Sequence, residues 1–146
     1  MNIIDTNGVS HIFTNNLALR QGYYLVPDVT EEVEMTELVH GRRIPNHVRE
    51  LIETDEFDEV LYLFHYKDVL NSYAGRSFYN MTGLGDVSIL AALYMLRDVF
   101  ARQQQEQLFA VSDSVTVYTD DVDLTTEINR VFSGNNITVL PVSAIS

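Results

Sequence analysis

Aspartates that could do chemistry stand directly after short apolar runs of the chain. Asp5 follows Asn2-Ile3-Ile4, and Asp120 and Asp121 follow Val115-Thr116-Val117-Tyr118. Short runs of apolar and β-branched residues are typical of buried strands. Because the carboxyl ends of parallel strands share one edge of a sheet, these aspartates are expected to meet where open α/β folds bind their ligands.

A further aspartate, Asp86, opens the strongest helical pattern in the chain. It precedes a core-facing stripe at helical spacing, formed by Ile89, Leu93, Leu96 and Phe100. On the same face as that stripe, the charge of Asp86 needs compensation by a cation or by the N–H groups of the first helical turn. A helix N-cap is the structural alternative at each of these aspartates. Together on one edge, they favour a site for Mg²⁺ or Mn²⁺, which prefer carboxylate oxygen ligands.

The elements that must position these residues alternate along the chain. Strands are expected at 2–4, 23–26, 115–118 and 137–140, and helices at 9–20, 29–40, 45–52, 55–73, from 86 onward and at 123–132. This alternation predicts an α/β fold over residues 1–146. We expect a single domain with a mostly parallel β-sheet of four to five strands and helices on both faces.

Composition narrows the class of protein. The 146 residues are 46% hydrophobic, enough for one core, and the absence of cysteine excludes disulfides and thiolate metal sites. No apolar run approaches the roughly 20 residues of a membrane span, and the first residues lack a signal-peptide pattern. We therefore expect a cytoplasmic protein with no membrane partner. The net charge of −12 argues against a broad electrostatic grip on nucleic acid, and it suits carboxylates gathered around cations.

One stretch departs from the acidic trend. Residues 40–49 contain Arg42, Arg43 and Arg49 together with two histidines, and they contain no acid. Such a stretch is either an ordinary exposed loop or a local patch that contacts phosphates.

The ordered acidic segments resemble those of PIN-domain nucleases. Ile3-Ile4-Asp5-Thr6-Asn7 is similar to the opening strand of that family, and Gly85-Asp86-Val87-Ser88-Ile89-Leu90-Ala91 is similar to its central acidic motif. Val117-Tyr118-Thr119-Asp120-Asp121-Val122-Asp123-Leu124 resembles its late motif, a strand that ends in Thr-x-Asp. Each segment is short, but their order and spacing cover essentially the whole chain.

This resemblance implies an acidic pocket in which Asp5, Asp86 and Asp121 bind Mg²⁺ or Mn²⁺, with Asp120 or Asp123 sharing or substituting. The remaining acid of the family comes from the helix after the second strand. Glu32 is the preferred candidate there, and the other glutamates of the same segment remain alternatives: Glu31, Glu34 and Glu37.

The function implied is that of an endoribonuclease, in which a metal-activated water cuts RNA. Small members of the family act as toxins silenced by an antitoxin and form dimers, so an antitoxin-like inhibitor and a homodimer are expected partners. Other members mature ribosomal RNA or degrade messenger RNA, and distant relatives cut branched DNA.

Two other functions compete. One is a non-catalytic PIN-like module that binds RNA or a protein. The other is a haloacid-dehalogenase-type phosphatase, because Asp5-Thr6-Asn7-Gly8-Val9 also resembles the first motif of that family. Against the phosphatase, Asn7 replaces the usual general acid, Leu90 replaces a further aspartate, and the single lysine, Lys67, stands in a helix that is expected to pack.

Overall fold

Five parallel strands form one sheet in the computed structural model, which describes residues 1–26, 45–73, 84–106 and 114–146. The strands are β1 (Asn2–Ile4), β2 (Tyr23–Leu25), β3 (Val48–Glu50), β4 (Val115–Tyr118) and β5 (Ile137–Leu140). The described helices are α1 (Thr6–Thr14), α3 (Glu59–Tyr73), α5 (Leu84–Glu106) and α6 (Val122–Val131), with 3₁₀ turns η1 (Leu51–Glu53) and η2 (Val142–Ala144).

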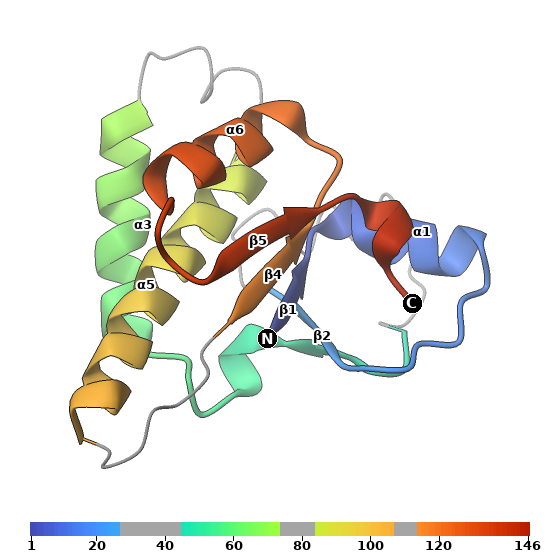
Figure 1. The fold of residues 1–146 in the computed structure, drawn as a ribbon, viewed down its shortest axis with the longest axis horizontal. Helices are drawn as coiled ribbons and strands as arrows, with labels where there is room; N and C mark the ends of the chain where they lie inside the picture. The colour runs from blue at the N-terminus through green and yellow to red at the C-terminus, as the bar shows by residue number, and fades with distance from the viewer. Residues whose placement is uncertain (27–44, 74–83, 107–113) are drawn as a thin grey trace.

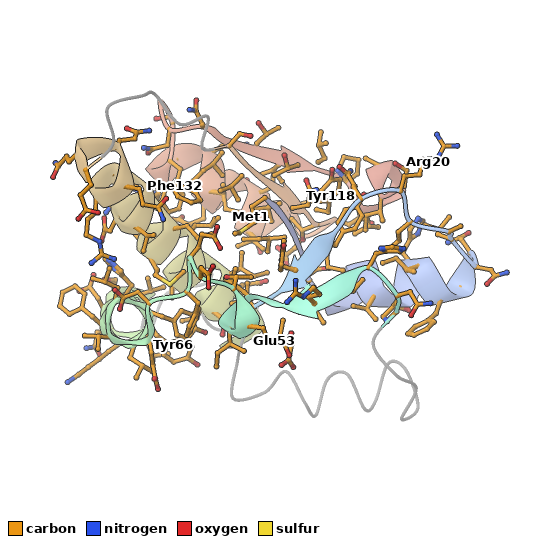
Figure 2. The ribbon with its side chains drawn as sticks, turned by 90° about the horizontal axis from the view of Figure 1, so that it is seen from below. Met1, Arg20, Glu53, Tyr66, Tyr118 and Phe132 are labelled. Carbon is orange, nitrogen blue, oxygen red and sulfur yellow. The ribbon has the colours of Figure 1, made fainter. Side chains whose placement is uncertain are left out.

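Helices cover both faces of the sheet, as Figure 1 shows. Successive strand residues point to opposite faces. Ile3 accordingly belongs to the core cluster under α3, α5 and α6, while its neighbour Ile4 belongs to the cluster under α1 and η2. Figure 2 shows the same division, with Phe132 on the side of α5 and Tyr118 on the side of α1. The predicted α/β class, with a parallel sheet and helices on both faces, is confirmed.

The order of the strands is β3-β2-β1-β4-β5, which places the first strand at the centre. The chain moves outward from β1 to β2 and β3, and it then returns to the opposite side of β1 to form β4 and β5. The direction of winding therefore reverses between β1 and β4. In open α/β sheets, ligands bind in the crevice outside the carboxyl ends of the strands at such a reversal.

Helix α5 is the central element of the larger core. The predicted stripe is confirmed at Ile89, Leu93 and Leu96, which are buried, while Phe100 is half-buried. Residues between the stripe positions, including Leu90 and two alanines, are fully buried as well. The reason is that α5 packs against the sheet on one side and against α3 on another. Within the described ranges, none of the helices combines the length and the apolar character that a membrane span requires.

The segment 45–52 corrects one prediction. We expected a short helix there, but the structure has strand β3 followed by the 3₁₀ turn η1. Only Val48 of the three strand residues is buried, because β3 is the edge strand of the sheet. A strand with only one buried residue lacks the alternation of apolar and polar residues from which a strand is predicted.

Helix ends also differ from the prediction. The helix expected at 9–20 begins at Thr6 and ends at Thr14, and Asn16 takes a positive φ of 48° that a helix cannot continue through. The helix expected from residue 55 begins at Glu59, and the one expected from residue 86 begins two residues earlier. The helix expected at 29–40 lies outside the described residues.

Candidate active site

Asp5 links the end of β1 to the start of α1. Its Oδ1 atom accepts a hydrogen bond of 2.8 Å from the backbone N–H of Gly8, so Asp5 is the N-cap of α1. The backbone reaches this position directly from Ile4, which is fully buried and therefore holds the end of the strand in the core. The carboxylate thus stands at the carboxyl edge of the central strand.

Thr119 joins the ends of β1 and β4. Its side-chain hydroxyl donates a hydrogen bond of 2.8 Å to Oδ2 of Asp5 and accepts one of 3.1 Å from the backbone N–H of Asp121. The residue is only 3% exposed. A buried hydroxyl that is used as donor and as acceptor sets the distance between the segments on either side of it. The two neighbouring strands therefore deliver their acidic ends to one place.

The two aspartates after Thr119 have different structural roles. Asp121 is the N-cap of α6, and its Oδ1 atom accepts a hydrogen bond of 2.9 Å from the N–H of Leu124. Asp120 is exposed, and its Oδ1 atom accepts a hydrogen bond of 3.1 Å from the N–H of Val142, at the start of η2. The N-cap alternative is thus realised at Asp5 and Asp121, while both carboxylates retain further lone pairs.

Electrostatics at this edge oppose the ionisation of Asp5. Burial raises the pKa of the Asp5 carboxyl above its ordinary value of 3.8, and the neighbouring charges of Asp120 and Asp121 raise it further. The hydrogen bonds from Gly8 and Thr119 act in the opposite direction without cancelling the rise in this pKa. A carboxylate in such surroundings gains from a nearby cation, because the cation offsets both desolvation and like-charge repulsion.

Asp86 lies in the first turn of α5 and is 8% exposed. The described part of the helix begins at Leu84, so Asp86 lies inside its first turn and not at the N-cap, which was the structural alternative for this aspartate. The later part of α5, around Phe100, lies near Val115 and Ile137, where β4 and β5 begin. The start of α5 is therefore directed toward the carboxyl edge, beside α6, as Figure 1 also shows.

The other predicted site residues are less closely gathered. Asp123 is half-buried in the first turn of α6, two residues beyond Asp121. Arg49 lies exposed on β3 and pairs with Glu53 at 3.9 Å, and β2 separates its strand from β1. The register pairs Arg49 with Tyr24 and through Tyr24 with Ile3, so two strand spacings of ~4.8 Å place it about 10 Å to the side of Ile3, two residues before Asp5. The remaining predicted residues lie outside the described part of the chain: Glu31, Glu32, Glu34, Glu37, Arg42 and Arg43.

The donor chemistry of the edge suits a hard cation, since the side chains there offer carboxylate and hydroxyl oxygens. Among the described residues, however, no three His, Asp or Glu side chains lie close enough together to form a metal-binding group. Three of the described carboxylates already accept a backbone hydrogen bond at the start of a helix or turn: Asp5, Asp120 and Asp121. Binding of a metal would therefore need a side-chain rotation or a ligand from outside the described ranges.

The sequence analysis did not predict the bridging role of Thr119. It included this residue only as part of the Thr-x-Asp motif. Its position between a buried strand and two aspartates was the available signal.

Comparison with protein-family models, with curated proteins and with solved structures finds no match to this chain. The interpretation of the site therefore depends on its own geometry.

Proposed function

We propose that this chain is a PIN-type endoribonuclease that hydrolyses RNA phosphodiester bonds with the help of Mg²⁺ or Mn²⁺. The observation that supports the proposal best is the bridge from Thr119 to Asp5 and Asp121, at the reversal point between β1 and β4. This is the part of an open α/β sheet where ligands bind. The choice of nuclease chemistry comes from the resemblance of the acidic segments.

Asp5, Asp86 and Asp121 are the proposed metal ligands, with Asp123 as a neighbour that can join them and Glu32 as the fourth catalytic acid. When bound, the metal supplies charge stabilisation and a water of lowered pKa for phosphodiester hydrolysis. The task of Thr119 is to hold the Asp5 carboxylate by its hydroxyl. Because burial and like charges raise the pKa of Asp5, a nearby cation would stabilise the charged form of this carboxylate.

Substrate approach must overcome the net charge of −12. Cations at the acidic edge reduce the repulsion of RNA locally, and Arg42, Arg43 and Arg49 are proposed to contact phosphates. The proposed location is cytoplasmic, as expected from the sequence, and the resemblance supports two protein partners, an antitoxin-like inhibitor and a second copy of the chain.

The test is cleavage of labelled single-stranded RNA, structured RNA and flap DNA, with Mg²⁺, with Mn²⁺ and with EDTA. Wild type is compared with Asp5→Asn and Asp86→Asn, and with Asp55→Asn, which makes the same chemical change at an exposed position before α3. The proposal requires metal-dependent cutting of RNA that falls by at least about 100-fold in the first two variants and persists in Asp55→Asn. Equal cutting by all four proteins would point to a contaminating nuclease and refute the assignment.

A non-catalytic PIN-like binding module is the second candidate. Its support is specific: Asp5 and Asp121 already serve as helix N-caps, and the described residues form no ready metal group. Absence of cleavage by folded wild type, together with unchanged melting temperature on addition of Mn²⁺, would favour this candidate. A phosphatase has less support, because Asn7 and Lys67 are both exposed and Lys67 lies on α3.

A further inference from the structure

A hollow of about 240 Å³ lies at the amino edge of the sheet, opposite the acidic edge. It is bounded by the later part of α5, by the starts of β4 and β5, and by the turn that follows α6. Its floor is apolar, with Leu96 and Val115 both buried, and Phe100 offers a half-buried ring. Ligand pockets for drug-sized molecules measure roughly 300–1,000 Å³, so this hollow suits a single ring system.

The described residues at the rim of the hollow carry hydrogen-bonding groups, and none of them is an acid. Arg97, Gln104, Asn135 and Asn136 surround the apolar floor, and none of the residues that line the hollow is Asp or Glu. Side-chain amides donate and accept hydrogen bonds at once, which suits the mixed donor and acceptor edge of a nucleobase.

Arg97 is held in place at this rim. Its guanidinium lies 4.9 Å from the centre of the Tyr94 ring, and its Nε atom lies 3.4 Å from Oδ1 of Asp98. Asp98 is itself engaged by His65 at 2.6 Å, so its charge is shared between two partners. A positioned guanidinium beside an aromatic ring is a common surface for stacking bases and for contacting phosphate.

The outer surface of α6 connects the acidic edge with the hollow. The helix starts next to Asp121 and ends just before the turn at 133–136 that borders the hollow. Its most exposed residues are Val122, Thr126, Asn129, Arg130 and, just beyond the helix, Ser133, while Asp123 and Glu127 are half-buried and Glu127 pairs with Arg130. The 10 residues of α6 span about 15 Å at ~1.5 Å each, the length of roughly four or five stacked nucleotides at ~3.4 Å.

We propose that this hollow binds one nucleobase of single-stranded RNA, four or five nucleotides away from the bond held at the acidic edge. The inference rests on the proposed nuclease function for its substrate. The size of the hollow, its amide-rich rim, the ring of Phe100 and the course of α6 from the acidic edge to the hollow support it independently of any metal.

The direct test is to titrate the metal-free wild-type protein with uridine, with adenosine and with inorganic phosphate, and to monitor binding by the NMR chemical shifts of the backbone amides. Two variants are compared with wild type. Asn136→Asp replaces the side-chain amide at the rim by a carboxylate of the same shape, and Ala101→Leu narrows the hollow without adding charge. The control is Asn71→Asp, which adds the same charge on the exposed side of α3. All variants must give folded spectra.

The expected result is that a nucleoside shifts the amides of residues 134–137 and that its dissociation constant rises at least fivefold in both hollow variants. The control should keep the wild-type constant. Identical shifts with phosphate alone, shifts confined to other regions, or equal weakening in the control would overturn the inference.

Cleavage kinetics separate this inference from the proposed function. With an RNA of nine nucleotides, Asn136→Asp should raise KM at least fivefold and leave kcat unchanged, because the hollow lies away from the reacting bond. Cleavage with an unaltered KM would overturn the inference and leave the nuclease standing. If a nucleoside shifts the amide signals at the hollow but the protein cleaves no RNA, the base-binding site is supported and the proposed nuclease function is rejected.

Discussion

The hydroxyl of Thr119 donates a hydrogen bond of 2.8 Å to the carboxylate of Asp5, although 114 positions separate the two residues. This bond joins the central strand to the strand beside it, outside the regular pairing of the sheet. It places the N-caps of α1 and α6 next to each other. The geometry of the candidate site therefore depends on one buried side chain that has no charge.

Replacement of Thr119 tests that dependence. Thr119→Val keeps the shape but leaves Oδ2 of Asp5 without this donor and the N–H of Asp121 without this acceptor, while Gly8 still donates to Oδ1 of Asp5. The expected loss is about 1–3 kcal/mol in the free energy of unfolding. Thr119→Ser retains the hydroxyl and should lose about 1 kcal/mol for one buried methyl group. Urea denaturation measures both, and a valine variant as stable as the serine variant would show that the bridge has no energetic value.

Gly8 tests how closely α1 lies on β1. A Cβ atom at this position would lie 3.0 Å from Cβ of Ile4 and 3.3 Å from Cδ1 of Ile145. Gly8→Ala should therefore lower the stability by about 1 kcal/mol or more, because overpacking outweighs the gain in helix propensity. The control is Gly22→Ala, whose added Cβ would meet only the carbonyl oxygen of His47 at 3.9 Å. Thermal melts of both variants check the difference, and equal melting temperatures would contradict it.

The raised pKa of Asp5 predicts a particular dependence of stability on pH. In the folded chain this carboxyl keeps its proton to a higher pH than the ordinary value of 3.8. The folded state thus binds more protons than the unfolded state between the two values, and the free energy of unfolding falls as pH rises through this window. Asp5→Asn removes that contribution.

The measurement is urea denaturation of wild type and Asp5→Asn at a series of pH values from about 3 to 8. Wild type should lose stability relative to the variant as pH rises from 3.8 through the folded pKa, and the difference should then become constant. Added Mn²⁺ should reduce the loss if Asp5 is a metal ligand. A difference that does not change with pH would disprove the raised pKa.

A polar contact between α3 and α5 should support the fold without affecting the site. His65 is 8% exposed, its Nε2 atom lies 2.6 Å from Oδ2 of Asp98, and its ring stacks on Tyr94 at 5.3 Å. His65→Phe retains a ring but removes the hydrogen bond, at an expected cost of about 1–3 kcal/mol.

Asp98→Asn is the milder partner change, because an amide oxygen still accepts a hydrogen bond from Nε2. Asp98 lies 12 residues beyond Asp86 on the same helix, about 18 Å along its axis. At saturating RNA and at a temperature where both variants are folded, kcat should therefore match wild type; KM is left out of this comparison because Asp98 also holds Arg97 at the hollow. A fall in kcat without unfolding would show that the contact acts on the site.

The sequence predicted the parts of this structure that depend on local pattern. β1, β4 and β5 carry continuous apolar or β-branched runs, and all were expected within a residue of their bounds. Asp5 and Asp121 were expected at the strand ends because an acidic residue interrupts each run. The stripe on α5 was visible because buried positions at helical spacing leave a strong periodic signal.

Features that depend on tertiary placement could not be predicted in the same way. β3 was missed because an edge strand needs only one buried residue, Val48. The helix α1 was predicted to be too long because Leu17 continues its apolar pattern, whereas the backbone leaves the helical conformation at Asn16. The hydrogen bond from Thr119 and the hollow beside Phe100 arise from segments that are distant in sequence, and no local pattern encodes them.

The central position of β1 has a consequence for how the protein is made. Its pairing with β4 brings Ile3 beside Val117, so the middle of the sheet forms only when residues more than a hundred positions apart meet. Contacts of this range slow folding, because loop-closure entropy must be overcome before they form. A nascent chain on the ribosome that has emerged only as far as α5 has Asp5 and Asp86 but no Thr119. It therefore cannot assemble the acidic edge until β4 has been synthesised.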